Sequence, residues 1–161
     1  MADLHIRNAG PEDADLVIRF IHALAEYEKL EGPDPEGEER IRRYGWGERP
    51  HFECLLAFEE GIPLGFALYF YQFSTFAARP TLYLEDLFVY PDRRGGGYGK
   101  ALLVALAREA VSQECGRMDW MVLDWNNPAI EFYRSLGADV MQEWELCRLS
   151  GQALVDLATS D

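Results

Sequence analysis

The apolar positions of the chain follow strand spacing in some segments and helix spacing in others. Alternation at Leu4 and Ile6 predicts a short first strand, and the Gly10-Pro11-Glu12-Asp13 run predicts the start of a helix. An apolar stripe at helical spacing marks this helix, formed by Val17, Phe20, Ile21, Leu24 and Tyr27. Gly32-Pro33-Asp34-Pro35 predicts its end, and residues 36–44 predict a short, highly charged second helix.

Three strand-like runs come next, over residues 54–59, 64–73 and 81–90. Glu60-Gly61 supplies a tight turn between the first two runs, so their order predicts an antiparallel meander. A long amphipathic helix is predicted over residues 98–113 and another strand over residues 118–123, which gives a strand, a crossover helix and a strand.

The last part of the chain predicts a helix over residues 127–136, a last strand over residues 140–149 and a short amphipathic helix over residues 152–158. The sequence contains no internal repeat and no interdomain linker. We therefore expect a single domain over residues 1–161, of the α/β (α+β) class.

Charge and composition argue against several classes of partner. The formal net charge of −13 would repel a polyanionic backbone, so no nucleic acid is expected, whereas small cations would be attracted. No apolar run approaches the roughly 18 residues of a membrane helix, and residues 1–8 lack an apolar signal core. We expect no membrane partner and a cytoplasmic location. The three cysteines and three histidines are scattered, without the spacing of a metal site, so no metal is expected.

The most informative segment joins the strand-like run at 81–90 to the long helix, and it contains four glycines between Arg94 and Lys100. Glycines allow positive φ and close backbone approach, so consecutive N–H groups can face an anion ahead of the helix dipole. We interpret this loop as a pyrophosphate cradle. Arg94 and Ala101 stand where a P-loop needs Gly and Ser or Thr, which argues against ATP and GTP. Lys100 and Leu102 stand where a dinucleotide fingerprint needs Gly, which argues against NAD and FAD.

The run Arg94-Gly95-Gly96-Gly97-Tyr98-Gly99 resembles the Arg/Gln-x-x-Gly-x-Gly/Ala signature of the GNAT superfamily of N-acetyltransferases, whose loop amides bind the pyrophosphate of CoA. More narrowly, the chain resembles the diamine (spermidine/spermine) and thialysine acetyltransferases. Four segments in the same order carry this likeness: Leu24-Ala25-Glu26-Tyr27-Glu28-Lys29-Leu30, Leu82-Tyr83-Leu84-Glu85-Asp86, Leu123-Asp124-Trp125-Asn126 and Phe132-Tyr133-Arg134-Ser135-Leu136-Gly137-Ala138. The resemblance implies a GNAT-like central mixed, mostly antiparallel sheet flanked by helices, with acetyl-CoA as cosubstrate.

The resemblance also implies two sets of binding residues. The expected acetyl-CoA contacts are Leu87, Phe88, Val89, Arg94, Gly95, Gly96, Gly97, Tyr98, Gly99, Lys100, Asn126, Pro128 and Ala129. The expected amine pocket contains Tyr27, Glu28, Glu85, Asp86, Asp119, Trp120 and Glu143. Simple strand alternation places Asp86 on the face opposite Glu85.

Two residues are expected to carry the chemistry. An alkylammonium with a pKa near 10 must lose a proton before its nitrogen can attack a thioester. Glu85 matches the residue that binds the amine and is proposed to relay this proton, although a salt bridge to a buried arginine is the structural alternative. Tyr133 matches the tyrosine that protonates the departing CoA thiolate, where the alternative is a core aromatic on an amphipathic helix.

The predicted function is acetyl transfer from acetyl-CoA to the primary amine of a small cationic metabolite, either a polyamine or a thialysine-like amino acid. One alternative is a non-catalytic module that senses acetyl-CoA or a polyamine, but Glu85 and Tyr133 argue against it. Another alternative is a protein or peptide N-acetyltransferase. The aromatic run Tyr69-Phe70-Tyr71-Gln72-Phe73 better suits the wall of a small pocket or a subunit interface. Relatives form homodimers, so a homodimer is expected.

Overall fold

The computed structural model describes residues 3–160 and contains two compact units. Residues 3–121 form the first unit and residues 122–160 the second. Each unit is described by itself. No helix within residues 3–160 has both the length and the apolar character that crossing a membrane requires.

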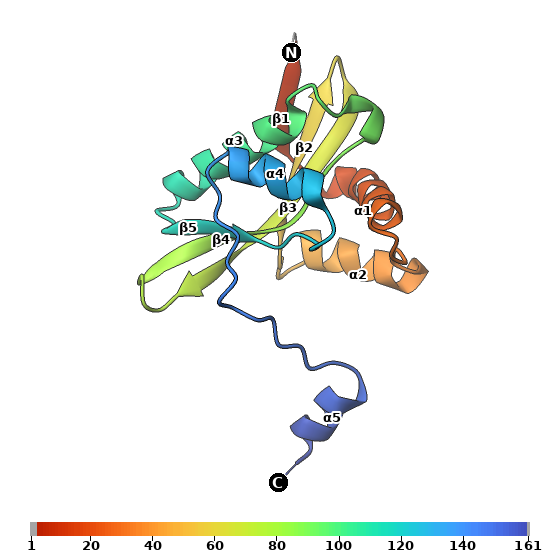
Figure 1. Cartoon of the computed structure of the whole chain (residues 1–161). Helices are drawn as coiled ribbons and strands as arrows, with labels where there is room; N and C mark the ends of the chain where they lie inside the picture. The colour runs from red at the N-terminus through yellow and green to blue at the C-terminus, as the bar shows by residue number, and fades with distance from the viewer. Residues whose placement is uncertain (1–2, 161) are drawn as a thin grey trace. The chain divides into compact units, whose positions relative to one another are not determined.

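A five-stranded sheet organises the first unit (Figure 1). Its strands lie side by side in chain order: β1 (Leu4–Asn8), β2 (Glu53–Glu59), β3 (Ile62–Ser74), β4 (Arg79–Val89) and β5 (Arg117–Trp120). The first four strands pair antiparallel, and β5 pairs parallel with β4. A parallel neighbour requires a crossover, which the helix between β4 and β5 supplies. The predicted meander and the predicted strand, helix and strand are therefore both confirmed.

The first unit also contains three α-helices. They are α1 (Ala14–Glu28), α2 (Pro35–Trp46) and α3 (Tyr98–Ser112), with single 3₁₀ turns η1 (Pro11–Asp13) and η2 (Pro91–Arg93). Helices α1 and α3 pack on the sheet, and α2 packs on α1. Figure 1 shows α1 and α3 on opposite sides of the sheet. The predicted second helix stops too early, because Gly45 and Trp46 continue it and the chain leaves the helix only at Gly47.

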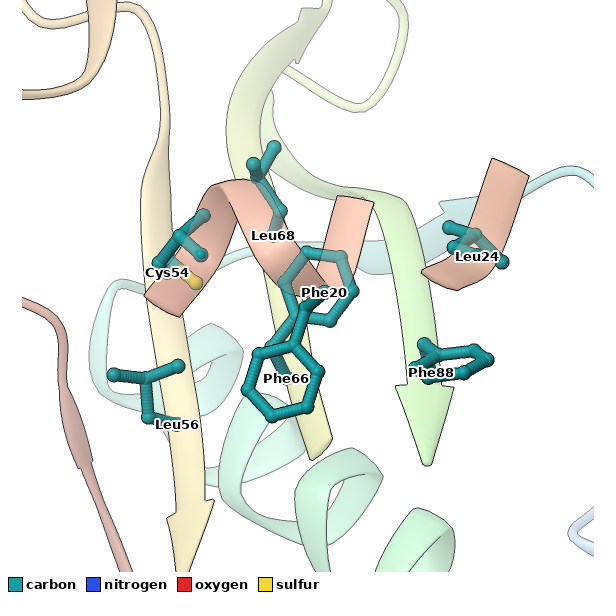
Figure 2. Close-up of a cluster of buried hydrophobic side chains, with 8 residues drawn as sticks. Phe20, Leu24, Cys54, Leu56, Phe66, Leu68 and Phe88 are labelled. Carbon is teal, nitrogen blue, oxygen red and sulfur yellow. The ribbon is translucent and has the colours of Figure 1, made fainter. Parts of the chain in front are cut away.

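The core under α1 is built from the apolar stripe that predicted this helix (Figure 2). Phe20 is fully buried, and its ring stacks on Phe66 of β3 with the centroids 5.3 Å apart. Cys54 and Leu56 of β2 and Phe88 of β4 join the same cluster. Burying aromatic and aliphatic groups of this size contributes about 1.5–3 kcal/mol each, so this cluster fixes α1 on the sheet.

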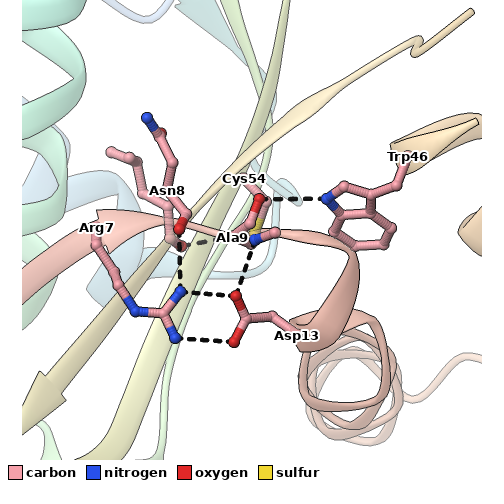
Figure 3. A network of polar contacts seen from close by, with 8 residues as sticks. Arg7, Asn8, Ala9, Asp13, Trp46 and Cys54 are labelled. Atoms are coloured by element: carbon pink, nitrogen blue, oxygen red, sulfur yellow. Dashed lines mark hydrogen bonds and ion pairs between the residues drawn. The ribbon is translucent and has the colours of Figure 1, made fainter.

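A polar network ties β1 to the start of α1 (Figure 3). Both terminal nitrogens of Arg7 donate to the carboxylate of Asp13, at 2.6 and 2.8 Å, and the backbone N–H of Gly10 donates to the same carboxylate at 2.8 Å. The hydrogen bonds from Arg7 hold the pKa of the buried Asp13 below its ordinary value. The indole N–H of Trp46 donates to the Ala9 carbonyl at 3.2 Å, which attaches the end of α2 to the same point.

The second unit contains α4 (Asn127–Ser135) and α5 (Gln152–Ala158), both close to their predicted bounds. The predicted strand over residues 140–149 is wrong, since this segment is neither strand nor helix. A strand must give its backbone hydrogen bonds to a neighbouring strand, and this segment is paired with no strand of residues 3–160. Its apolar side chains are exposed, with Trp144 at 77% and Leu146 at 65%. Strand β5 is also shorter than predicted, since it ends at Trp120.

Candidate active site

The glycine-rich loop, residues 94–99, connects η2 to the start of α3. Gly95 and Gly97 both have a φ of +83°, which explains why glycine stands at these positions. Gly97 is the N-cap of α3, and the N–H of Ala101 donates to the Gly97 carbonyl at 2.9 Å as the first helical bond. The amides of residues 98–100 precede that bond, so they remain for an external acceptor. The loop therefore fits a pyrophosphate group held by backbone N–H groups at a helix start.

Two side chains hold this loop at its ends. The Nε–H of Arg94 donates to the carbonyl of Val89 at 3.1 Å, and the hydroxyl of Tyr98 donates to Glu59 of β2 at 2.7 Å. A Cβ at Gly96 would lie 2.6 Å from the Tyr98 ring, so the loop passes close to that ring. The sequence alone did not identify Glu59, because its contact joins the end of β2 to the start of α3, which are far apart in the chain, and no local motif predicts it.

The pairing of β3 with β4 is irregular at Glu85 and Asp86. Leu68 of β3 pairs with Asp86 and the next residue, Tyr69, pairs with Leu84, so Glu85 has no register partner on β3. This is the pattern of a β-bulge, which breaks the alternation of faces along a strand. The prediction that Glu85 and Asp86 lie on opposite faces rested on regular alternation, which the bulge interrupts, so it stays a prediction. Glu85 is exposed, whereas Asp86 is half-buried.

Three carboxylates form an acidic cluster here: Glu28 at the end of α1, with Glu85 and Asp86 on β4. Burial, with the nearby charges of Glu85 and Glu28, raises the pKa of Asp86 to about 7. Burial also raises the pKa of Glu28. A carboxyl group with a pKa near neutrality can accept and release protons at physiological pH, so the cluster is suited to proton transfer from a bound ammonium group.

Besides the acidic cluster, the expected amine pocket includes residues of α1 and β5 in the first unit. Tyr27 lies beside Glu28 in the last turn of α1, and Asp119 and Trp120 lie on β5 opposite Tyr83 and Leu84 of β4. Asp119 accepts a hydrogen bond from the Nε–H of Arg117 at 3.0 Å, so its carboxylate already has a cationic partner.

Tyr83 is a residue of this region that the sequence alone did not assign. Its ring lies 5.1 Å from that of Phe70, and burial, followed by the charges of Glu85 and Asp119, raises its pKa. It therefore lies close to both acids. The signal was present in the Leu82-Tyr83-Leu84-Glu85-Asp86 segment, but strand alternation alone does not distinguish a pocket aromatic from a core aromatic.

The second unit holds the remaining predicted residues. Asn126 is the N-cap of α4, and its side-chain oxygen accepts from the N–H of Ala129 at 3.4 Å, with Pro128 in the first turn. Tyr133 is half-buried on the same helix, with its ring 5.4 Å from that of Phe132. Glu143 is exposed in the irregular segment that follows. The assembly of these residues with the acidic cluster into one active site stays a prediction.

Within residues 3–160, no three His, Cys, Asp or Glu side chains are grouped in a way that suits a metal ion.

Comparison with known proteins places the chain in a family. Residues 19–138 match the model of the acetyltransferase (GNAT) family. The chain is 37% identical to thialysine N-epsilon-acetyltransferase of Sus scrofa, over 98% of this chain and 99% of that protein. It is 31% identical to spermidine/spermine N(1)-acetyltransferase-like protein 1 of Homo sapiens, over 95% of this chain and 23% of that protein. Its structure is similar to that of an integron cassette protein from the mobile metagenome of V. cholerae, with a TM-score of 0.82 and 31% identity over 98% of this chain and 99% of that one. The chain therefore belongs to the GNAT family of acetyltransferase enzymes.

Proposed function

We propose that the protein transfers the acetyl group of acetyl-CoA to the primary amine of a small cationic metabolite. The observation that carries this proposal is the course of β4. The strand runs from Glu85 and Asp86 through Leu87, Phe88 and Val89 toward the glycine-rich loop. At about 3.3 Å per residue, Asp86 and Val89 are separated by about 10 Å of strand. One element thus brings an acidic cluster close to a loop suited to a pyrophosphate.

The reaction needs two proton movements. The ammonium group of the amine gives a proton to a carboxylate, for which Glu85 and Asp86 are the candidates, directly or through water. The free nitrogen then attacks the thioester carbonyl carbon, the C–N bond forms, and the C–S bond breaks to leave the CoA thiolate. Tyr133 is the proposed donor of the proton that this thiolate takes up. The backbone of Leu87, Phe88 and Val89, the loop amides and the start of α4 are the proposed contacts of acetyl-CoA.

The acidic cluster favours a cation as the acceptor. Several carboxylates around a partly desolvated amine attract it and discriminate against anions, and this attraction weakens with salt. Within the small cations, we favour a thialysine-like amino acid slightly over a polyamine. The segment Val122-Leu123-Asp124-Trp125-Asn126 is closer to the thialysine enzymes, and the identity to the Sus scrofa protein extends over nearly all of both chains.

A panel of amines tests this function. We expect kcat/KM for thialysine, lysine and spermidine to exceed that for an aminoglycoside and for a lysine-containing peptide, measured by release of free thiol from acetyl-CoA. Preference for the peptide or the aminoglycoside would contradict a small cationic acceptor. Clear preference for spermidine would contradict only our choice between the two small cations. Tight binding of acetyl-CoA and an amine without thiol release would support the alternative of a sensing module.

The proposal also covers the organisation of the chain. The family match over residues 19–138 crosses the boundary between the two units, which supports one catalytic domain over residues 1–161.

The cytoplasm is the proposed location of the protein. Its three cysteines, Cys54, Cys115 and Cys147, are free thiols, as is usual for proteins of a reducing compartment.

A homodimer is the proposed assembly, and the irregular segment supports it. Val140, Met141, Trp144, Leu146 and Leu149 are all exposed, and a second copy of the chain could bury these apolar side chains. We expect sedimentation equilibrium to give twice the mass of the chain. Replacing Trp144 and Leu146 by serine should shift the equilibrium toward the monomer, whereas a wild-type monomer at micromolar concentration would contradict the assembly.

A further inference from the structure

The side chain of Arg94 makes a set of contacts that joins the glycine-rich loop to α1. Its guanidinium carbon lies 4.2 Å from the centroid of the Tyr27 ring and 5.7 Å from that of Phe88. Its Nε–H donates to the Val89 carbonyl at 3.1 Å. These contacts place the guanidinium over the face of the Tyr27 ring and use one of its five N–H donors. They do not use the four N–H groups of the two terminal nitrogens, which suit a phosphate oxygen.

Tyr27, whose ring lies against Arg94, belongs to the proposed amine-binding part of the site. Tyr27 lies in the last turn of α1, next to Glu28 of the acidic cluster. The helix ends directly afterwards, because Lys29 has a φ of +59° and the backbone turns away. The position of the Tyr27 ring is therefore set from one side by the core under α1 and from another by Arg94.

We propose that Arg94 is a positioning residue that couples the acetyl-CoA loop to the amine-binding end of α1 through its stack on Tyr27. This inference rests on the proposed function. An arginine already held by a ring face and a carbonyl loses less conformational freedom when it binds a phosphate, so the ring contributes to acetyl-CoA affinity. Because coupling between two sites is reciprocal, order in the loop also fixes the Tyr27 wall of the amine pocket.

If the two subsites are coupled, a substitution on the amine side should change the affinity for CoA, whereas independent subsites would not show this effect. A cation–π contact of about 1 kcal/mol corresponds to a factor of about five in binding. We therefore expect Tyr27→Leu to weaken CoA binding about fivefold by calorimetric titration, although Tyr27 belongs to the amine side. Tyr27→Phe keeps the ring face and should bind CoA within about twofold of wild type. The matched control is Glu28→Gln, the next residue, which should raise the KM of the amine and leave CoA affinity unchanged.

A double-mutant cycle separates coupling from general disturbance of α1. If the stack carries the effect, Tyr27→Leu should weaken CoA binding in the wild-type background but have no further effect in Arg94→Leu. The proposed coupling would be overturned if the losses of CoA affinity in Tyr27→Leu and Arg94→Leu added in the double variant. It would also be overturned if Tyr27→Leu bound CoA as tightly as wild type does. These titrations do not depend on turnover. A wild-type protein that fails to bind CoA would contradict the proposed function itself, whereas CoA binding without the Tyr27 effect would contradict only this inference.

Discussion

Replacing Tyr133 by phenylalanine should lower kcat by about 10²–10⁴-fold, because a positioned general acid contributes a factor of that order. The substitution removes the phenolic proton and keeps the ring that packs beside Phe132 on α4. Affinity for acetyl-CoA should change little, so kcat and kcat/KM should fall together. Steady-state kinetics with the best amine of the panel, together with calorimetric titration of CoA, measures both quantities.

The control for this substitution is Tyr44→Phe, on the exposed side of α2, which should leave kcat unchanged. If Tyr133→Phe turns over as fast as wild type at saturating substrates, another group or water protonates the thiolate. That outcome would remove Tyr133 from the mechanism and would leave the carboxylates and the loop in place.

The elements of the first unit could be predicted from the sequence because each one carries a strong local signal. The apolar stripe of α1, the Glu60-Gly61 turn and the glycines before α3 all stand where the structure uses them. The segment expected as a strand over residues 140–149 also contains many apolar residues, yet it is not a strand. An apolar segment can suit a half-buried surface, but its own sequence does not supply the neighbouring strand.

In the candidate site, too, the features that depend on local sequence could be predicted, and those that depend on contacts between distant residues could not. The glycine-rich loop could be predicted because its conformation depends on the glycines themselves. The bulge at Glu85 could not, since it arises from the register between β3 and β4, which local sequence does not specify. The stack of Arg94 on Tyr27 and the hydrogen bond from Tyr98 to Glu59 join residues far apart in the chain, so they too required the folded arrangement.

Replacing Asp86 by asparagine should make the protein more stable at pH 8 and less active. Burial and the charges of Glu85 and Glu28 raise the pKa of Asp86 from 3.8 to about 7 in the folded state. The folded state therefore holds its proton more tightly than the unfolded chain does. The free energy of unfolding should fall as pH rises from about 4 to about 7, by at most about 4 kcal/mol at 1.36 kcal/mol per pKa unit. The asparagine side chain of the variant stays neutral, so the variant should keep the stability that the wild type loses.

Urea unfolding at pH 4 and pH 8 measures this difference. The two proteins should have similar stability at pH 4, where Asp86 is largely protonated in the folded state and about half protonated in the unfolded chain, and should diverge as the pH approaches 8. Asp92→Asn, at an exposed carboxylate near the loop, is the control and should follow the wild-type curve. Parallel curves for Asp86→Asn and wild type would show that Asp86 titrates normally. If the carboxylate receives the ammonium proton or binds the amine, kcat/KM should fall in the same variant. A stabilising substitution that removes activity is the result expected where a buried charge is retained for function at a cost in stability.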